Sequence, residues 1–291
     1  MDSHVHACPH LNARTVTVFD AVRQAAASGL RGLGLMDNFC NSAGYAALVM
    51  QELGDLGVDV FGGLIMEPPA GGVTLEAVEA ALGYGYGPGT TARFISLPTH
   101  HTRHIATLEG RSKAYIESCC SIPEAGDLPD PLPAILDRIV EADVVLNTGH
   151  LSGPEALRLV EIAKQRGQQR ILVPASHYQK DEVGELTKLG AIAEFSFFFV
   201  SHATQAGLTH VDAQAHTVPP VSLPVMVELI RTATPEHSII NSDGGVFILP
   251  SPVEALREFL LLLESAGFWR DELRTMSSIN PGRLFRIGGQ I

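Results

Sequence analysis

The sequence predicts an α/β protein, a (β/α)8 TIM barrel that spans residues 1–291 as a single domain. Apolar runs typical of buried strands alternate eight times with amphipathic helical patterns, which is typical of a parallel sheet with helices outside it. In addition, polar residues suited to metal binding follow strands at both ends of the chain. A closed barrel brings such positions together, whereas a doubly wound open sheet, the competing architecture, leaves them apart.

Each expected element rests on a local pattern. The strands are expected near 3–6, 32–36, 58–66, 92–97, 143–148, 170–175, 191–199 and 238–242. The helices are expected at 21–27, 43–53, 75–82, 134–142, 154–166, 181–189, 223–232 and 252–265. Several helices begin with capping residues, such as Thr74 and Ser251. Because few residues precede the first strand's histidines, we expect that strand to be short or incomplete.

The composition, the cysteines and the first residues together indicate a cytoplasmic protein that does not bind nucleic acid or membranes. The 291 residues include 20 Lys and Arg against 32 Asp and Glu, and this formal charge of −12 repels nucleic acid from most of the surface. The four cysteines form no C-x-x-C pair, and the first residues lack the layout of a signal peptide. Every apolar stretch is far shorter than the roughly 20 residues that span a bilayer. We expect no nucleic-acid or membrane partner, while a homo-oligomer is compatible with the sequence.

Five polar residues share one context, because each lies at the end of an apolar, strand-like run. They are His4, His6, His150, His177 and Asp243. Since side chains alternate along a strand, His4 and His6 point to the same side and can bind one ion together. A single histidine is more often an ordinary hydrogen-bonded group, but five repeats of one context favour a metal site. Imidazole and carboxylate ligands suit zinc, and also manganese or iron.

This set resembles the amidohydrolase superfamily of metal-dependent hydrolases. The family pattern is H-x-H after strand one, histidines after strands five and six, and aspartate after strand eight. The tail Ser-Ile-Asn-Pro-Gly-Arg-Leu-Phe-Arg-Ile, residues 278–287, is also similar to the ending common in that family. The resemblance covers nearly the whole chain, and its motifs are specific as a set.

The resemblance implies a mechanism. A metal held by His4, His6 and Asp243 would lower the pKa of a bound water toward about 7 and supply hydroxide. Asp243 would act as the general acid and base. His150 and His177 would either complete a second metal site or, with His177 as a catalytic residue, bind the carbonyl oxygen of the substrate. One or two ions are therefore expected.

The sequence departs from the family at strand four. Binuclear members often carry a lysine or a glutamate there, but this chain reads Phe94-Ile-Ser-Leu-Pro-Thr-His100-His101. We favour a single, tightly bound ion. The alternatives are that a histidine of this cluster replaces the bridging group, or that Glu67 or Glu194 enters from another strand.

Substrate binding is predicted for the segment after strand four and for one residue after strand seven. His100, His101 and Arg103 belong to the first, and His202 to the second. A guanidinium with neighbouring imidazoles suits an acid group, so we expect Arg103 to orient an anionic substrate. A solvated or salt-bridged basic loop is an equally good interpretation of this cluster.

The leading prediction for function is hydrolysis of a C–N or C–O bond, in an amide, cyclic amide, imide, lactone or ester, by metal-bound hydroxide. The first alternative is a metal-dependent decarboxylase of the same superfamily, because some members without the strand-four lysine are lyases. The second is a phosphoesterase, although Gly244 and Gly245 follow Asp243 where Asp-x-His would be expected. The third is a non-catalytic barrel that binds a ligand or a metal.

Overall fold

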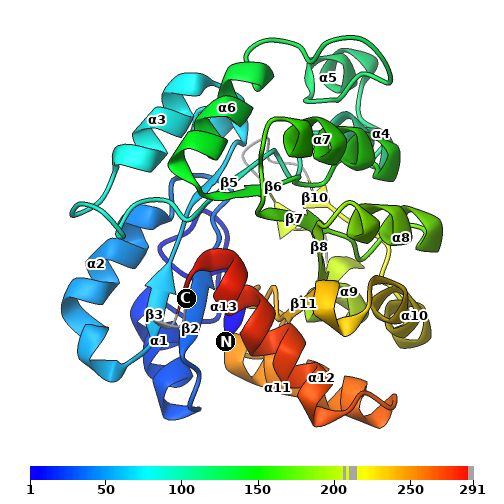
Figure 1. The fold of residues 1–291 in the computed structure, drawn as a ribbon. Helices are drawn as coiled ribbons and strands as arrows, with labels where there is room; N and C mark the ends of the chain where they lie inside the picture. The colour runs from blue at the N-terminus through cyan, green and yellow to red at the C-terminus, as the bar shows by residue number, and fades with distance from the viewer. Residues whose placement is uncertain (206–207, 210–214, 288–291) are drawn as a thin grey trace.

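The centre of the fold is a ring of parallel strands with helices outside it (Figure 1). The computed structural model describes residues 1–205, 208–209 and 215–287. The strands are β1 (Asp2–Val5), β2 (Gly32–Leu35), β3 (Asp59–Phe61), β4 (Leu64–Ile65), β5 (Phe94–Ser96), β6 (Val145–Asn147), β7 (Ile171–Pro174), β8 (Ile192–Ser196), β9 (Leu208–Thr209), β10 (Ala215–His216) and β11 (Ser238–Asn241). The helices are α1 (Val18–Ala27), α2 (Ala43–Leu53), α3 (Leu75–Gly83), α4 (Arg103–Leu108), α5 (Lys113–Ser118), α6 (Leu132–Ala142), α7 (Gly153–Gln165), α8 (Lys180–Lys188), α9 (Phe197–Val200), α10 (Leu223–Ala233), α11 (Pro252–Ser265), α12 (Arg270–Arg274) and α13 (Asn280–Phe285).

Strand order follows the chain around the ring, as in a (β/α)8 barrel. One run is β1-β2-β3 and the other is β11-β8-β7-β6-β5-β4, with parallel pairing throughout both. β3 and β4 are two halves of one barrel strand, separated by Gly62 and Gly63. A Cβ at Gly63 would lie 2.3 Å from the carbonyl oxygen of Phe94, so glycine permits this close approach. At the seam between β1 and β11, His6 N donates to Gly244 O at 2.8 Å.

Strand side chains alternate between the inside of the ring and the helices. The inward-facing cluster includes Phe94, Val145, Leu172 and Ile239. Their neighbours Ile95, Leu146, Val173 and Ile240 belong to the larger core under the helices. This alternation is the period of two expected for strands, and it fills the barrel with side chains.

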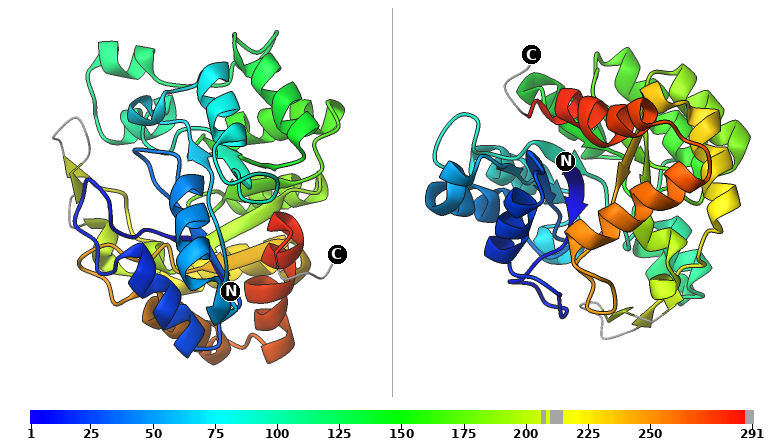
Figure 2. Two further views of the ribbon diagram at one scale, coloured as in Figure 1. Left: turned by 90° about the vertical axis from the view of Figure 1, so that its left-hand side faces the viewer. Right: turned by 90° about the horizontal axis from the view of Figure 1, so that it is seen from below.

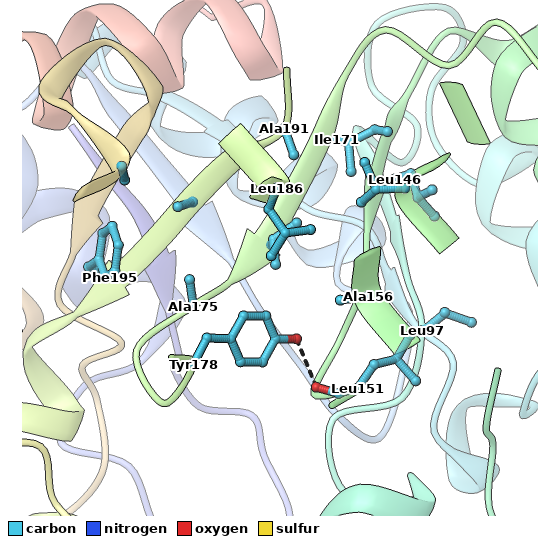
Figure 3. Packing of buried hydrophobic residues seen from close by; sticks show 14 of the residues in the cluster. Leu97, Leu146, Leu151, Ala156, Ile171, Ala175, Tyr178, Leu186, Ala191 and Phe195 are labelled. Atoms are coloured by element: carbon cyan, nitrogen blue, oxygen red, sulfur yellow. Dashed lines mark hydrogen bonds between the residues drawn. The ribbon is translucent and has the colours of Figure 1, made fainter. Parts of the chain in front are cut away.

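The outer core is formed by strands and the amphipathic helices that cover them. Figure 3 shows Leu146 and Ile171 from the sheet together with Ala156 of α7 and Leu186 of α8. The Tyr178 hydroxyl donates to the carbonyl oxygen of Leu151 at 2.8 Å, so this buried polar group is satisfied.

The last helices close the amino-terminal end of the ring. Leu284 and Phe285 of α13 join the inner cluster, and the Phe285 ring lies 4.5 Å from that of Phe61, measured between centroids. The Met1 amino group donates to Ser277 O at 2.8 Å, so the first and last segments lie side by side (Figure 2). The opposite, carboxyl-terminal end of the ring is therefore the end available for chemistry.

The predicted strands and helices are present, with three local differences. The run at 58–66 is split into β3 and β4 by the glycine pair described above. The run at 191–199 ends as a strand at Ser196, because Phe197–Val200 turns into α9, where Phe198 N donates to Ser242 O. The cluster after strand four, expected as a loop, begins α4, which is capped by the Thr102 side chain accepting from Ile105 N. β1 is short, as expected, with 4 residues.

None of the helices within the described ranges is both long enough and apolar enough to cross a membrane.

Candidate metal centre

Three predicted ligands meet at the carboxyl-terminal end of the ring. His4 lies in β1 and His6 directly after it, so both side chains point to the same side. Asp243 follows β11 in the left-handed region, with φ of 45°, which turns the chain sharply at the strand end. Gly245 has φ of 106°, and a Cβ there would lie 1.7 Å from the carbonyl oxygen of His6. Glycine at this position is therefore required for the two strand ends to meet.

The distances between these ligand atoms fit a small divalent cation. The Asp243 Oδ1 atom lies 3.4 Å from His4 Nε2 and 3.2 Å from His6 Nε2. Ligand atoms about 2.0 to 2.1 Å from a tetrahedral zinc ion are roughly 3.3 Å from one another. Among the described residues, this is the group of histidine, cysteine and acidic side chains whose ligand atoms all lie within 4.8 Å.

A buried carboxylate orients His4. Glu194, in β8, has its Oε1 atom 3.3 Å from His4 Nδ1, so that Nε2 is left to face Asp243. Asn241 Nδ2 donates to the same oxygen at 2.7 Å, and Ser196 Oγ donates to Asn241 Oδ1 at 2.7 Å. A carboxylate on the second nitrogen of a metal-binding histidine is a common arrangement that fixes its tautomer and ring orientation.

The electrostatics of the centre favour a positive charge between the carboxylates. Burial by itself lowers the pKa of His4, but Asp243 and Glu194 outweigh it and raise this pKa to about 9. Burial would raise the pKa of Asp243, but His4 and His6 hold it below its usual value. Burial lowers the pKa of His6 to about 4, so its imidazole is neutral and able to bind a metal at pH 7.

A cavity of ≈ 90 Å³ opens beside these ligands. Its polar lining includes His4, His6, Arg14, Asn38, His100, His150 and Asp243, and also Glu109, whose carboxylate lies 3.9 Å from Arg111 Nε. Its apolar wall includes Ile65, Ile105, Phe198, Phe199 and Val246. The cavity thus combines a cluster of ligand atoms with a hydrophobic wall, which is the usual character of a small-molecule site.

His150 and His177 both line a second, smaller cavity, but of the two only His150 also lines the cavity beside His4, His6 and Asp243. His150 lines the cavity, and burial lowers its pKa to about 4, so it is neutral at pH 7. His177 Nε2 instead lies 2.7 Å from the carbonyl oxygen of Pro219. The Phe199 ring contacts both, with centroid distances of 4.7 Å to His177 and 6.4 Å to His150. The contact to Pro219 uses Nε2 of His177 and leaves Nδ1 as the nitrogen with which it could bind an ion or a substrate.

The predicted substrate-binding residues divide in the same way. His100 lines the cavity, and its ring lies 6.2 Å from that of His150. His101 instead packs against Tyr115, with ring centroids 5.4 Å apart. Arg103, the first residue of α4, lines a separate outer groove, and His202 is exposed on a turn after α9. Of these four residues, His100 is the one that the fold brings to the ligand cluster.

Glu67 supports the segment that carries His100. Its carboxylate accepts hydrogen bonds from the backbone amides of Thr99, at 2.6 Å, and of His100 and His101. Glu67 is 5% exposed, so these bonds hold the segment in a buried setting. Its oxygens are occupied by the backbone, whereas Glu194 contacts His4 directly. Of the two glutamates considered from the sequence, Glu194 is therefore the one that reaches the ligand cluster.

Several cavity residues were not identified from the sequence, among them Arg14, Asn38 and Glu109. Arg14 follows His6 by eight positions in the loop between β1 and α1, and Asn38 lies in the loop after β2. The loop sequences have no period that would show which side chains face the cavity. The one indication in the sequence was that polar residues occur in a loop at the carboxyl end of a strand, where barrel active sites lie.

Comparison with solved structures shows the same fold. The chain is similar to an organophosphorus hydrolase from Deinococcus radiodurans, with a TM-score of 0.59 and 16% identity, covering 92% of this chain and 82% of that one. It is similar to a protein described as an organophosphate-hydrolysing enzyme engineered from a weak promiscuous lactonase, with a TM-score of 0.59, 15% identity, and coverage of 92% and 85%. A zinc-bound amidohydrolase from Burkholderia multivorans matches with a TM-score of 0.55 and 11% identity over 92% and 88% of the two chains.

These likenesses confirm the predicted barrel and its resemblance to amidohydrolases in fold. A search of curated proteins found no match to this sequence. Residues 1–194 match one family model, and they contain β1 with His4 and His6 as well as Glu194 of β8. The chain therefore belongs to the family described as a family of unknown function, DUF6282.

Proposed function

We propose that this protein is a metal-dependent hydrolase whose ion, most favourably zinc, is held by His4, His6 and Asp243. The observation that carries the proposal is the convergence of these three side chains, with ligand atoms 3.2 to 3.4 Å apart, beside a cavity. Two imidazole nitrogens and a carboxylate oxygen suit zinc, with manganese or iron as alternatives, and His4 would lose its proton when the ion binds. We propose one ion. His150 and His177 remain predicted ligands of a second ion, and His150 is the one that lines this cavity.

Each residue has a role in the proposed reaction. A bound divalent cation lowers the pKa of water and makes hydroxide available near neutral pH. Asp243 accepts a proton at its carboxylate and returns it to the leaving group. His150, neutral at pH 7, donates a hydrogen bond to the carbonyl oxygen of the substrate. We retain His177 as a predicted catalytic residue that would act through Nδ1, because its Nε2 contacts the carbonyl of Pro219.

The proposed substrates are small molecules with a scissile C–O or C–N bond. The solved structures of similar fold include a mutant of a protein described as a PTE-like lactonase, so lactones and esters are the first bonds to test, followed by amides and cyclic imides. We also propose that residues 1–291 act as one domain, because His4 and Asp243 come from opposite ends of the chain. A cytoplasmic location remains a prediction.

The first experiment measures metal content and turnover together. We expect about one zinc, manganese or iron ion per chain by inductively coupled plasma mass spectrometry on protein purified without chelators. A His4→Ala/His6→Ala double variant should lose the ion, whereas His237→Ala, on a turn before β11, should retain it. Hydrolysis of a lactone, ester or amide panel, dependent on the ion, supports the proposal. A chain that retains no ion after reloading with each metal contradicts it.

Product analysis separates the other interpretations. Release of carbon dioxide from a carboxylated substrate would identify the decarboxylase, and release of phosphate from a monoester would identify the phosphoesterase. Tight ligand binding with no turnover by the metal-loaded protein would identify a non-catalytic barrel. A catalytic role is favoured over the non-catalytic barrel because Asp243 contacts both histidine ligands and also lines the cavity.

A further inference from the structure

We propose that Arg14 binds an anionic group of the substrate, a carboxylate or a phosphoryl group, in the cavity beside His6 and Asp243. This inference rests on the proposed function, because only an enzyme would make the bound anion a substrate. It assigns to Arg14 the role that the sequence had indicated for Arg103. The chemical class of ligand that it predicts is a small acid with an apolar body.

The backbone holds Arg14 next to the metal centre. Arg14 forms an antiparallel bridge with Val246, and Thr15 N donates to Gly245 O at 2.9 Å. These contacts fasten the loop after β1 to the loop that follows Asp243. As a result, Arg14, His6 and Asp243 line the same cavity.

The guanidinium of Arg14 has few partners of its own. Its Nη2 donates to His10 Nε2 at 2.9 Å and its Nη1 to Ala13 O at 3.3 Å. Its Nε is buried without a hydrogen-bond partner in the described part of the chain. Within the same residues, no carboxylate oxygen lies within 4.0 Å of this guanidinium. An arginine next to a cavity with unused donors is suited to bidentate binding of an oxyanion.

The charge of Arg14 persists at neutral pH. Burial lowers its pKa to about 10, while the carboxylates of Asp243 and Asp37 act in the opposite direction. Arg14 is therefore protonated at pH 7. A partly buried cation without a carboxylate partner among the described residues is costly, and a bound anion would compensate that cost.

The rest of the cavity defines the remainder of the ligand. Asn38, which is 7% exposed, lines the same cavity and supplies a second polar group. Phe198 and Phe199 form part of the apolar wall. Arg103 lines a different groove, together with Glu124, Asp127 and other residues outside the barrel. Arg14 is thus the arginine that can contact a molecule positioned at the metal ligands.

The test compares anionic and neutral ligands of the same shape. Benzoate, phenylphosphonate and the neutral benzamide are titrated by isothermal calorimetry into zinc-loaded and metal-free protein. The wild type should bind at least one of the two anions roughly 10-fold more tightly than benzamide in both forms. Arg14→Met should weaken anion binding by about 10- to 100-fold and leave benzamide unchanged, because a charge-assisted hydrogen bond is lost. The preferred anion identifies the carboxylate or the phosphoryl class.

Two further variants keep the result interpretable. Arg158→Met is the matched control, because Arg158 also has a buried Nε without a partner among the described residues but lines the outer groove. It should leave anion binding within twofold of wild type. Arg14→Lys retains the positive charge and should show an intermediate loss of anion affinity. This variant can replace Arg14→Met if the methionine variant is unfolded at the assay temperature.

Each outcome bears on one of the two proposals. An anion preference that survives Arg14→Met, or that is lost in Arg103→Met instead, overturns the inference. A wild type with no preference for either anion over benzamide also overturns it. If the chain retains no metal but its anion preference still depends on Arg14, the anion site is supported and the hydrolase proposal fails.

Discussion

Replacement of Glu194 by glutamine should weaken zinc binding although Glu194 contacts no ion in the proposed site. Glu194 Oε1 lies 3.3 Å from His4 Nδ1 and accepts from Asn241 at 2.7 Å. Glutamine preserves the volume but replaces the charged acceptor with a neutral one, so His4 is held less firmly and its nitrogen becomes less basic. Loss of such a supporting carboxylate typically costs 10- to 100-fold in metal affinity, or about 1.4 to 2.7 kcal/mol.

The assay is competition for zinc against a chromophoric chelator at fixed pH, with wild type, Glu194→Gln and Glu155→Gln. Glu155 is the matched control, because its carboxylate accepts from Ser152 N and Ile122 N, at 3.0 Å each, away from the metal centre. Glu155→Gln should leave the zinc affinity within about twofold. A folded Glu194→Gln variant with wild-type zinc affinity would refute the reasoning.

Three other perturbations have expected outcomes. Gly245→Ala places a Cβ 1.7 Å from His6 O, so it should separate the two strand ends and abolish zinc binding; retained zinc binding by chelator competition would contradict this. Glu67→Ala leaves buried amides of Thr99 and His100 without an acceptor and should lower the free energy of unfolding by about 3 to 5 kcal/mol in urea titration; a loss below about 1 kcal/mol would contradict this. Burial raises the pKa of Asp2 from 3.8 to about 6, so the native state binds the extra proton and the contribution of Asp2 to stability is lost as pH rises from 4 to 6. His6 and His150, with pKa lowered to about 4, act in the opposite direction, so the measurement is the difference in free energy of unfolding between metal-free wild type and Asp2→Asn, which should change by about 3 kcal/mol over this range.

Controls for these variants lie elsewhere in the chain. Gly83, at the end of α3, has open space where a Cβ would be added, so Gly83→Ala should leave zinc binding unchanged. Glu76 lies in the first turn of the same helix on the surface, and Glu76→Ala should change the free energy of unfolding by less than about 1 kcal/mol.

The sequence predicted the barrel because its signals are local and repeated. Apolar runs such as Ile171–Pro174 followed by helical patterns specify parallel strands without knowledge of any contact. The period of two along a strand was enough to place His4 and His6 on one side. The position of Asp243 at the end of the last strand then followed from barrel closure, and the structure brings it to these histidines.

The loops could not be predicted in the same way. Arg103 and His101 follow strand four, as predicted, but a helix that begins at Arg103 and is capped by Thr102 turns them away from the ligand cluster. His177 ends its strand as expected, but it contacts the carbonyl of Pro219, 42 residues further along the chain. Such contacts depend on how two distant segments pack, and no periodic pattern encodes them.

The seam between β1 and β11 has a consequence for the order in which the protein matures. During synthesis, His4 and His6 are made before Asp243, which joins them after the other strands of the ring have been made. A metal bound at this seam would link β1 to β11. Because His6 N donates to Gly244 O across the seam, the hydrogen exchange rate of the His6 amide should fall when the metal is bound. Loading of the ion would then mark the last step of assembly and would slow the first step of unfolding.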